Sequence, residues 1–161
     1  MRGERRGGQP GAGLLRTAFR ERPRSATIAA EVRRVSDLQR EIERRSLDGG
    51  LPCAAAFAIA VDLGVPLDEV VDRINGAGVR IVHCQLGLFG YHAFGDKRFV
   101  GSLARVPDRL ADVLHAGRVY EALPCVTAWE IAEREGLPRP VVGSAADALG
   151  IRIAPCQLGC F

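Results

Sequence analysis

The chain has 161 residues and a net charge of +3, with 47% hydrophobic and 25% charged residues. This balance is typical of a globular protein with one ordinary domain or two very small ones, rather than of a disordered chain. No apolar run approaches the ~20 residues of a membrane span, and no apolar stretch follows the N-terminal arginines, so we expect a cytoplasmic protein without membrane attachment.

The positive charge is concentrated at the N-terminus. Residues 1–24 contain seven arginines and two glutamates, a net +5, whereas residues 25–161 contain 15 basic and 17 acidic side chains, a net −2. We therefore predict that residues 1–25 form a disordered basic tail, which could attach loosely to phosphates.

An internal repeat organises the remaining chain. Residues 51–89 and 123–161 align without a gap at an offset of 72 residues, with 17 identities in 39 positions. The identities include Leu-Pro-Cys at the start and Cys-Gln-Leu-Gly-x-Phe at the end. Because the match extends weakly upstream, we predict one repeat unit at 26–90 and a second at 108–161. Residues 91–107 are predicted to form a linker or a wing-like extension.

Each unit is predicted to begin with a helix. Leu38 and Ile42 lie one turn apart on one face of the first helix. Ser36 and Asp108 occupy matched positions and are suitable N-cap residues, while the apolar spacing upstream allows the first helix to extend back over residues 26–35.

The rest of each unit is predicted to be two helices followed by a short strand. In the first unit the second helix opens after Leu51-Pro52, Gly64 makes a turn, and a helix at 67–75 precedes a strand at 79–82. In the second unit the corresponding elements are a helix at 125–135, a turn at Gly136, a helix at 140–149 and a strand at 151–154. The predicted fold is mainly α with short β elements, in which two tandem units pack as one pseudo-symmetric domain.

These helix pairs resemble helix-turn-helix and winged-helix-like domains. The resemblance rests on Ile59-Ala60-x-x-Leu63-Gly64-Val65-x4-Val70 and on Ile131-Ala132-x-x-x-Gly136-Leu137-x4-Val142. In both, a small alanine lets the helices approach, the glycine makes the turn, and the later valine locks the second helix onto the first. The resemblance implies a small DNA-binding transcriptional regulator, whose second helix enters the major groove.

Basic residues supply the candidate DNA contacts. They are Arg73, Arg80, Lys97, Arg98, Arg139 and Arg152. The helix at 67–75 is nevertheless acidic on its outward face, and neither second helix carries the side chains that read bases well. This acidity favours an alternative, a protein-interaction adaptor without DNA binding that has a protein partner or forms a homodimer.

The cysteines suggest a further alternative, a metal- or redox-responsive module. Four lie at matched positions, with C-x30-C spacing in each unit: Cys53, Cys84, Cys125 and Cys156. If the units meet about a twofold axis, these thiolates could converge on zinc or an iron–sulfur cluster. The same four cysteines are also consistent with redox sensing through a reversible disulfide, or with small hydrophobic residues that fill the same place in both cores.

Two expectations concern individual thiols. Cys53 and Cys125 start helices, so the helix dipole is expected to lower their pKa. Cys160 has no counterpart in the first unit and is expected to be an exposed thiol without a role. The sequence contains no phosphate-binding loop, repeated carboxylate pair or nucleophile elbow, so it does not predict an enzyme.

Overall fold

The computed structural model describes residues 28–47, 49–91, 103 and 105–161. The helices are α1 (Ile28–Arg45), α2 (Cys53–Leu63), α3 (Leu67–Gly76), α4 (Asp108–Ala116), α5 (Cys125–Arg134) and α6 (Arg139–Ala148). The strands are β1 (Leu51–Pro52), β2 (Ile81–Val82), β3 (Ala122–Leu123) and β4 (Arg152–Ile153). The predicted fold class, mainly α with short β elements, is confirmed. The predicted tail and most of the segment at 91–107 lie outside the described residues.

Glycine turns join α2 to α3 and α5 to α6, as predicted. Gly64 and Gly136 have φ values of 61° and 63°, in the left-handed region that glycine enters without steric cost. The N–H group after each glycine returns to the preceding helix, where Val65 N donates to the Ala60 carbonyl at 3.0 Å. These bonds satisfy the last carbonyl groups of α2 and α5.

Each helix pair is closed by a parallel pair of very short strands. Leu51 of β1 pairs with Ile81 of β2, and Leu123 of β3 pairs with Ile153 of β4. The sequence patterns predicted the later strand of each pair but not the earlier one. Two residues are too few to show an alternating pattern, and the partner strand lies about 30 residues away along the chain.

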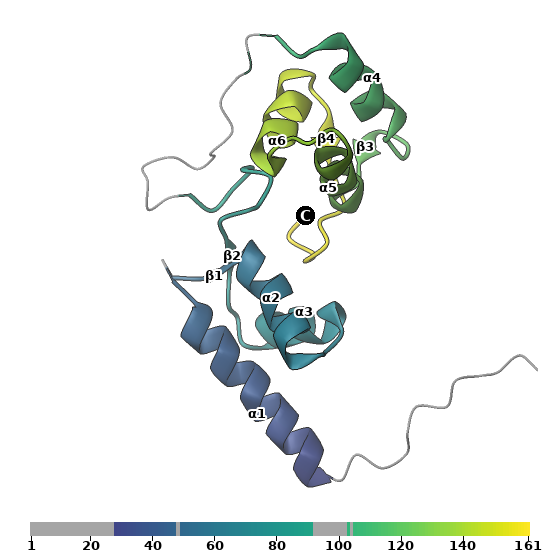
Figure 1. Cartoon of the computed structure of the whole chain (residues 1–161). Helices are drawn as coiled ribbons and strands as arrows, with labels where there is room; N and C mark the ends of the chain where they lie inside the picture. Colours follow the sequence, from purple (N-terminus) through teal and green to yellow (C-terminus); the bar gives the residue numbers. More distant parts are fainter. Residues whose placement is uncertain (1–27, 48, 92–102, 104) are drawn as a thin grey trace, which may run out of the picture.

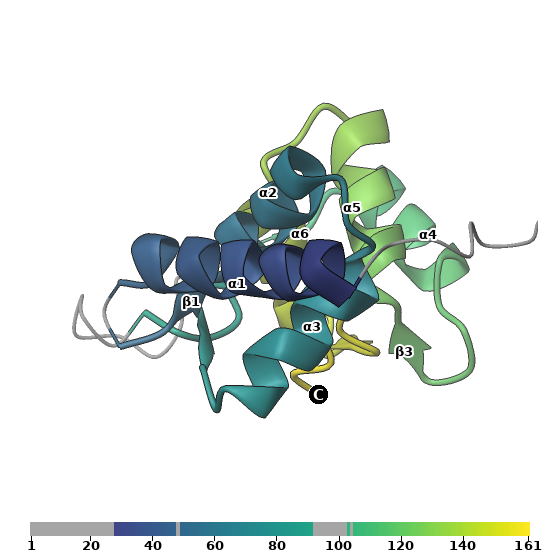
Figure 2. The same ribbon diagram turned by 90° about the horizontal axis from the view of Figure 1, so that it is seen from below.

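The described helices pack around two hydrophobic cores. We refer to residues 28–91 as the first half and to residues 105–161 as the second half. One core is formed mainly by α1–α3 and the other by α4–α6 (Figure 1). Helix α1 packs against both α2 and α3 (Figure 2). The C-terminal segment returns from the second half into the space between the two helix groups (Figure 1).

Helix α1 is longer than an N-cap at Ser36 would allow. The Ser36 hydroxyl lies in the middle of α1 and donates to the Val32 carbonyl at 2.8 Å, so the N-cap expectation is wrong and the upstream extension is correct. In α4, Pro107 occupies the N-cap position and Asp108 is the first helical residue. Only Leu38 and Ile42 of α1 are buried, and Ile28 near its start is 85% exposed.

None of the helices in the described part of the chain is both long enough and apolar enough to cross a membrane.

Candidate functional site

The repeated Cys-Gln-Leu-Gly-x-Phe sequences form two closed loops, which we call the motif loops (84–89 and 156–161). In each, the N–H group of the cysteine donates to the phenylalanine carbonyl at 3.1 Å. Gly87 and Gly159 donate back to the cysteine carbonyl and have φ values of 77° and 68°. A side chain is strained at such φ values, which explains why both copies have glycine at this place.

The leucine of each motif loop lies in the core of the opposite half. Leu86, from the first half, is 1% exposed and packs with the residues of α4–α6. Leu158, from the second half, is 4% exposed and packs with α1–α3. A Cβ atom at Gly143 of α6 would overlap the Leu86 carbonyl, so the glycine is required for this close approach. The two motif loops therefore hold the halves together through reciprocal contacts.

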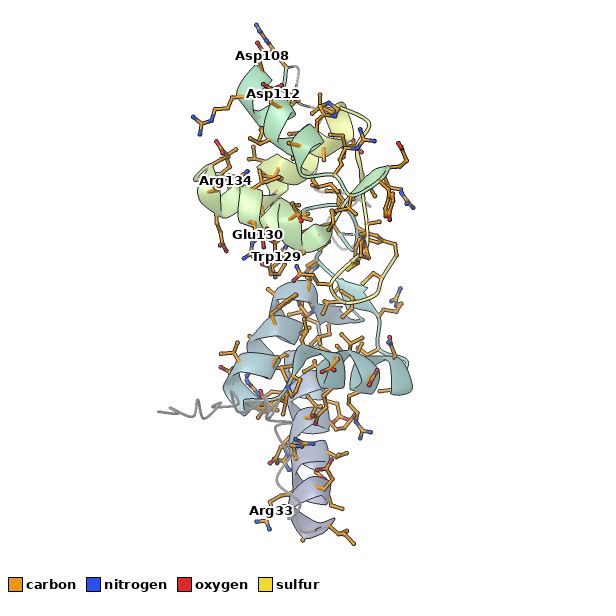
Figure 3. The ribbon with its side chains drawn as sticks, turned by 90° about the vertical axis from the view of Figure 1, so that its right-hand side faces the viewer. Arg33, Asp108, Asp112, Trp129, Glu130 and Arg134 are labelled. Carbon is orange, nitrogen blue, oxygen red and sulfur yellow. The ribbon has the colours of Figure 1, made fainter. Side chains whose placement is uncertain are left out.

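Two aromatic pairs also join the halves. Phe57 of α2 contacts Trp129 of α5 with ring centroids 4.6 Å apart, and Phe89 meets Phe161 edge to face at 5.7 Å. Each pair joins residues at matched positions of the repeat. Figure 3 shows Trp129 at the boundary between the two helix groups. The junction between the halves is thus built from the repeated residues themselves.

Each motif glutamine binds a cysteine at the start of a helix. Gln85 Nε2 donates to Cys53 Sγ at 3.8 Å, and Gln157 Nε2 donates to Cys125 Sγ at 3.5 Å. The backbone N–H group of Cys125 also donates to the Pro155 carbonyl at 3.1 Å. Cys125 is therefore held by the two residues that flank Cys156, which places this C-x30-C pair side by side.

All five cysteines are free thiols, and each interacts with at least one other cysteine. Cys156 is central: the thiols of Cys125 and Cys160 hydrogen-bond to it, and Leu158 N donates to its sulfur at 3.4 Å. Cys53 and Cys84 are close enough to interact electrostatically with Cys156. Cys160 therefore also lies beside Cys156, and its local spacing, Cys-x3-Cys, was the signal that the sequence interpretation overlooked.

Of the three thiols of Cys125, Cys156 and Cys160, the Cys156 thiol is the one whose surroundings favour ionisation. Hydrogen bonds from Cys125 and then Cys160 hold the pKa of the Cys156 thiol well below its usual range. The same bonds raise the pKa of Cys125 and of Cys160, because each keeps its proton as the donor. These hydrogen bonds therefore favour the thiolate on Cys156 over a thiolate on Cys125 or Cys160.

The expectation that helix N-termini lower the pKa of Cys53 and Cys125 is wrong. Burial raises the pKa of Cys53 to about 11, since a thiolate loses hydration in an apolar core. For Cys125 the hydrogen bond to Cys156 is the largest cause of the increase, and burial adds to it.

Within the described ranges, no group of three or more histidine, cysteine, aspartate or glutamate residues is arranged to hold a metal ion. The cysteines of the predicted zinc or iron–sulfur site interact with one another, but they are not arranged as the ligands of a metal ion. These residues are Cys53, Cys84, Cys125 and Cys156.

Among the predicted DNA contacts, Arg139 has several partners inside the protein. Its guanidinium lies 3.6 Å from the centroid of the Trp129 ring. It also donates to Gln85 Oε1 and pairs with Glu133 at 3.5 Å. Arg139 thereby connects α6 to the motif loop of the first half, a role that its sequence position alone did not indicate.

The remaining predicted contacts are dispersed. Arg80 and Arg152 are exposed, and Arg80 makes a long hydrogen bond of 3.4 Å to the Gly49 carbonyl. The Nε atom of Arg73 is buried and has no hydrogen-bond partner among the described residues. Lys97 and Arg98 lie outside the described residues. Among the described residues, no contact brings these predicted DNA-binding arginines together into one basic site.

The second helix of each pair offers little surface for a DNA groove. In α6 the five consecutive residues 142–146 are all buried, and the backbone of the motif loop 84–89 lies against Gly143. In α3 Asp68 and Asp72 are exposed, and Glu69 pairs with Arg34 of α1 at 3.3 Å. A buried helix and an acidic helix are both poorly suited to contact phosphates.

No protein-family model, no curated protein and no solved structure matches this chain.

Proposed function

We propose that this protein is a redox-responsive module in which Cys125 and Cys156 interconvert between a dithiol and a disulfide. One observation supports this above the others: both residues flanking Cys156 bind Cys125, through the Pro155 carbonyl at 3.1 Å and Gln157 Nε2 at 3.5 Å. A cysteine pair held side by side, with one thiolate and one thiol, has the components that disulfide formation requires.

The chemistry is balanced with a peroxide as the oxidant. The Cys156 thiolate attacks one peroxide oxygen, the O–O bond breaks, and protonation of the leaving oxygen gives water and a sulfenic acid on Cys156. Cys125 sulfur then attacks the Cys156 sulfur, and the hydroxyl group leaves as a second water with the Cys125 proton. Two thiols are oxidised, and one peroxide is reduced to two waters.

The response would follow from the position of Cys156 at the start of its motif loop. Leu158, two residues later, packs in the core of α1–α3, and Leu158 N donates to Cys156 Sγ in the reduced protein. A bond from Cys156 to Cys125 removes the thiolate that accepts this hydrogen bond and draws the loop toward α5. Oxidation therefore changes the packing of Leu158, and with it the strength of the contact between the second half and the core of the first half.

Thiol mapping by mass spectrometry tests the proposal. The reduced full chain is treated with hydrogen peroxide, alkylated and digested, and the native chain should give a Cys125–Cys156 disulfide. Cys125→Ser and Cys156→Ser should each abolish it. Cys84→Ala removes a buried thiol outside the reacting pair, so it is the matched control and should retain the disulfide.

Two results would contradict the proposal. One is oxidation of other cysteines without a Cys125–Cys156 bond. The other is zinc or iron in the reduced protein that is lost in Cys156→Ser, which would favour the metal-binding prediction. DNA binding remains a separate prediction from the helix-turn-helix resemblance, and no contact described above favours it over the redox proposal.

A further inference from the structure

A cavity of about 350 Å³ lies between residues of the two halves, and no described residue of its lining is a cysteine. Both motif loops contribute to its wall, the first through Leu88 and Phe89 and the second through Phe161. The two phenylalanine rings meet edge to face at 5.7 Å, so the wall includes aromatic surface from both halves. The other apolar residues of the wall are in β4 or next to it: Ile151, Ile153 and Ala154.

The charged side chains of Arg152 and Asp147 also line this cavity. Asp147, near the end of α6, already has an interaction within the protein. The guanidinium of Arg152 is exposed and has no hydrogen-bond or ion-pair partner among the described residues. The matched arginine of the first half, Arg80, differs because it donates to the Gly49 carbonyl at 3.4 Å. The charge of Arg152 is therefore available to a ligand.

We infer that this cavity binds small carboxylates with an apolar, aromatic body. Cavities of this size with a mostly apolar wall and few polar groups are typical of small-molecule sites. The guanidinium of Arg152 presents parallel N–H donors that match the two oxygens of a carboxylate. The aromatic body packs against Phe89 and Phe161, where edge-to-face contacts add to the burial of apolar surface.

The lining favours a carboxylate over two other classes of ligand. A neutral apolar molecule fills the cavity but leaves the Arg152 guanidinium without a partner. A phosphate dianion needs more donors than one guanidinium supplies, and its second charge would lie against an apolar wall. A carboxylate carries a single charge, and the apolar wall beside Arg152 strengthens its ion pair relative to one in open water.

The test uses phenylacetate as the probe and phenylacetamide as its neutral control. The reduced full chain is titrated with each while backbone amide signals are followed by NMR. We expect phenylacetate to cause saturable shifts at residues 151–154, and phenylacetamide to bind at least ~5-fold more weakly. Arg152→Gln keeps much of the side-chain length but loses the charge, so it should weaken phenylacetate binding at least ~5-fold. Arg80→Gln removes the matched arginine of the first half and is the control, which should bind like the native chain.

A second variant tests the cavity itself. Ala154→Leu adds volume to the wall and leaves Arg152 in place. The backbone bond from Ala154 N to the Leu123 carbonyl at 2.9 Å does not involve the substituted side chain. This variant should lose binding of phenylacetate and of phenylacetamide, with circular dichroism showing that it is folded.

Three results would overturn the inference. One is the absence of saturable binding of phenylacetate by the native chain at concentrations up to ~10 mM. Another is equal binding of phenylacetate and phenylacetamide, or equal binding by Arg152→Gln and Arg80→Gln, since the carboxylate would then not be recognised by Arg152. The third is saturable shifts confined to α1–α3, which would place the ligand elsewhere. All measurements use the reduced chain, so none of these results affects the redox proposal, on which this inference does not depend.

Discussion

The crossed positions of the two motif leucines lead to a specific stability prediction for Leu158→Ala. Leu158 belongs to the second repeat but packs in the core of α1–α3, where it is 4% exposed. Truncating a buried leucine to alanine costs about 3 kcal/mol, which corresponds to a roughly hundredfold loss of protection from hydrogen exchange. Because the lost contacts are with the first half, amide protons of α1–α3 should exchange faster, and those of α4–α6 should change much less.

Native-state hydrogen exchange of the full chain, resolved by mass spectrometry of peptides, measures this directly. Leu86→Ala is the reciprocal variant: Leu86 is 1% exposed among α4–α6, so its loss should accelerate exchange in the second half. Val61→Ala truncates a side chain that is 79% exposed and serves as the control, with little effect on either half. Faster exchange of α4–α6 alone in Leu158→Ala, or equal acceleration of both halves, would refute the reciprocal arrangement.

Three further predictions concern packing, ionisation and charge. Gly143→Ala should lower the free energy of unfolding, measured by chemical denaturation, by more than the ~1–3 kcal/mol of ordinary overpacking, because its Cβ meets backbone. Gly76→Ala, with open space around it, should be neutral or stabilising. Cys53 has a pKa near 9 when unfolded and about 11 when folded, so the unfolded chain loses this proton first as the pH rises. The free energy of unfolding should therefore fall between these two pH values, and it should fall less steeply in Cys53→Ala. In fluorescence anisotropy, deleting residues 1–24 should remove most of any salt-dependent DNA affinity, since they carry a net +5 and the rest −2; an unchanged salt slope would assign the phosphate contacts to the folded body.

Local patterns predicted the helices and turns because those elements depend mostly on nearby residues. The turns at Gly64 and Gly136 need a left-handed backbone, which glycine signals by itself. The predicted helix at 67–75 corresponds to α3 at Leu67–Gly76, and the helix at 140–149 to α6 at Arg139–Ala148. Local pattern does not define the start of α1, because a serine such as Ser36 suits an N-cap and can also donate to the helix carbonyl four residues earlier, as it does here.

The candidate site was predictable only in part. The repeat identified the four matched cysteines as a set, but proximity of Cys125 to Cys156 depends on bonds made by Pro155 and Gln157 across 30 residues of chain. The predicted pseudo-symmetric packing of the units remains a prediction. It is favoured by the contacts between matched aromatic residues, since a twofold axis brings equivalent positions together.

The sequence by itself determined the duplication, the order of helices and turns, and the residues that both copies share. Only the tertiary structure decided where the shared residues go: Leu86 and Leu158 enter opposite cores, Arg139 lies on Trp129, and Cys160 joins the thiol group. The physical reason is the range of the forces involved. Backbone preference acts within a few residues, whereas burial and hydrogen bonding to a thiol depend on whichever distant segment fills the space.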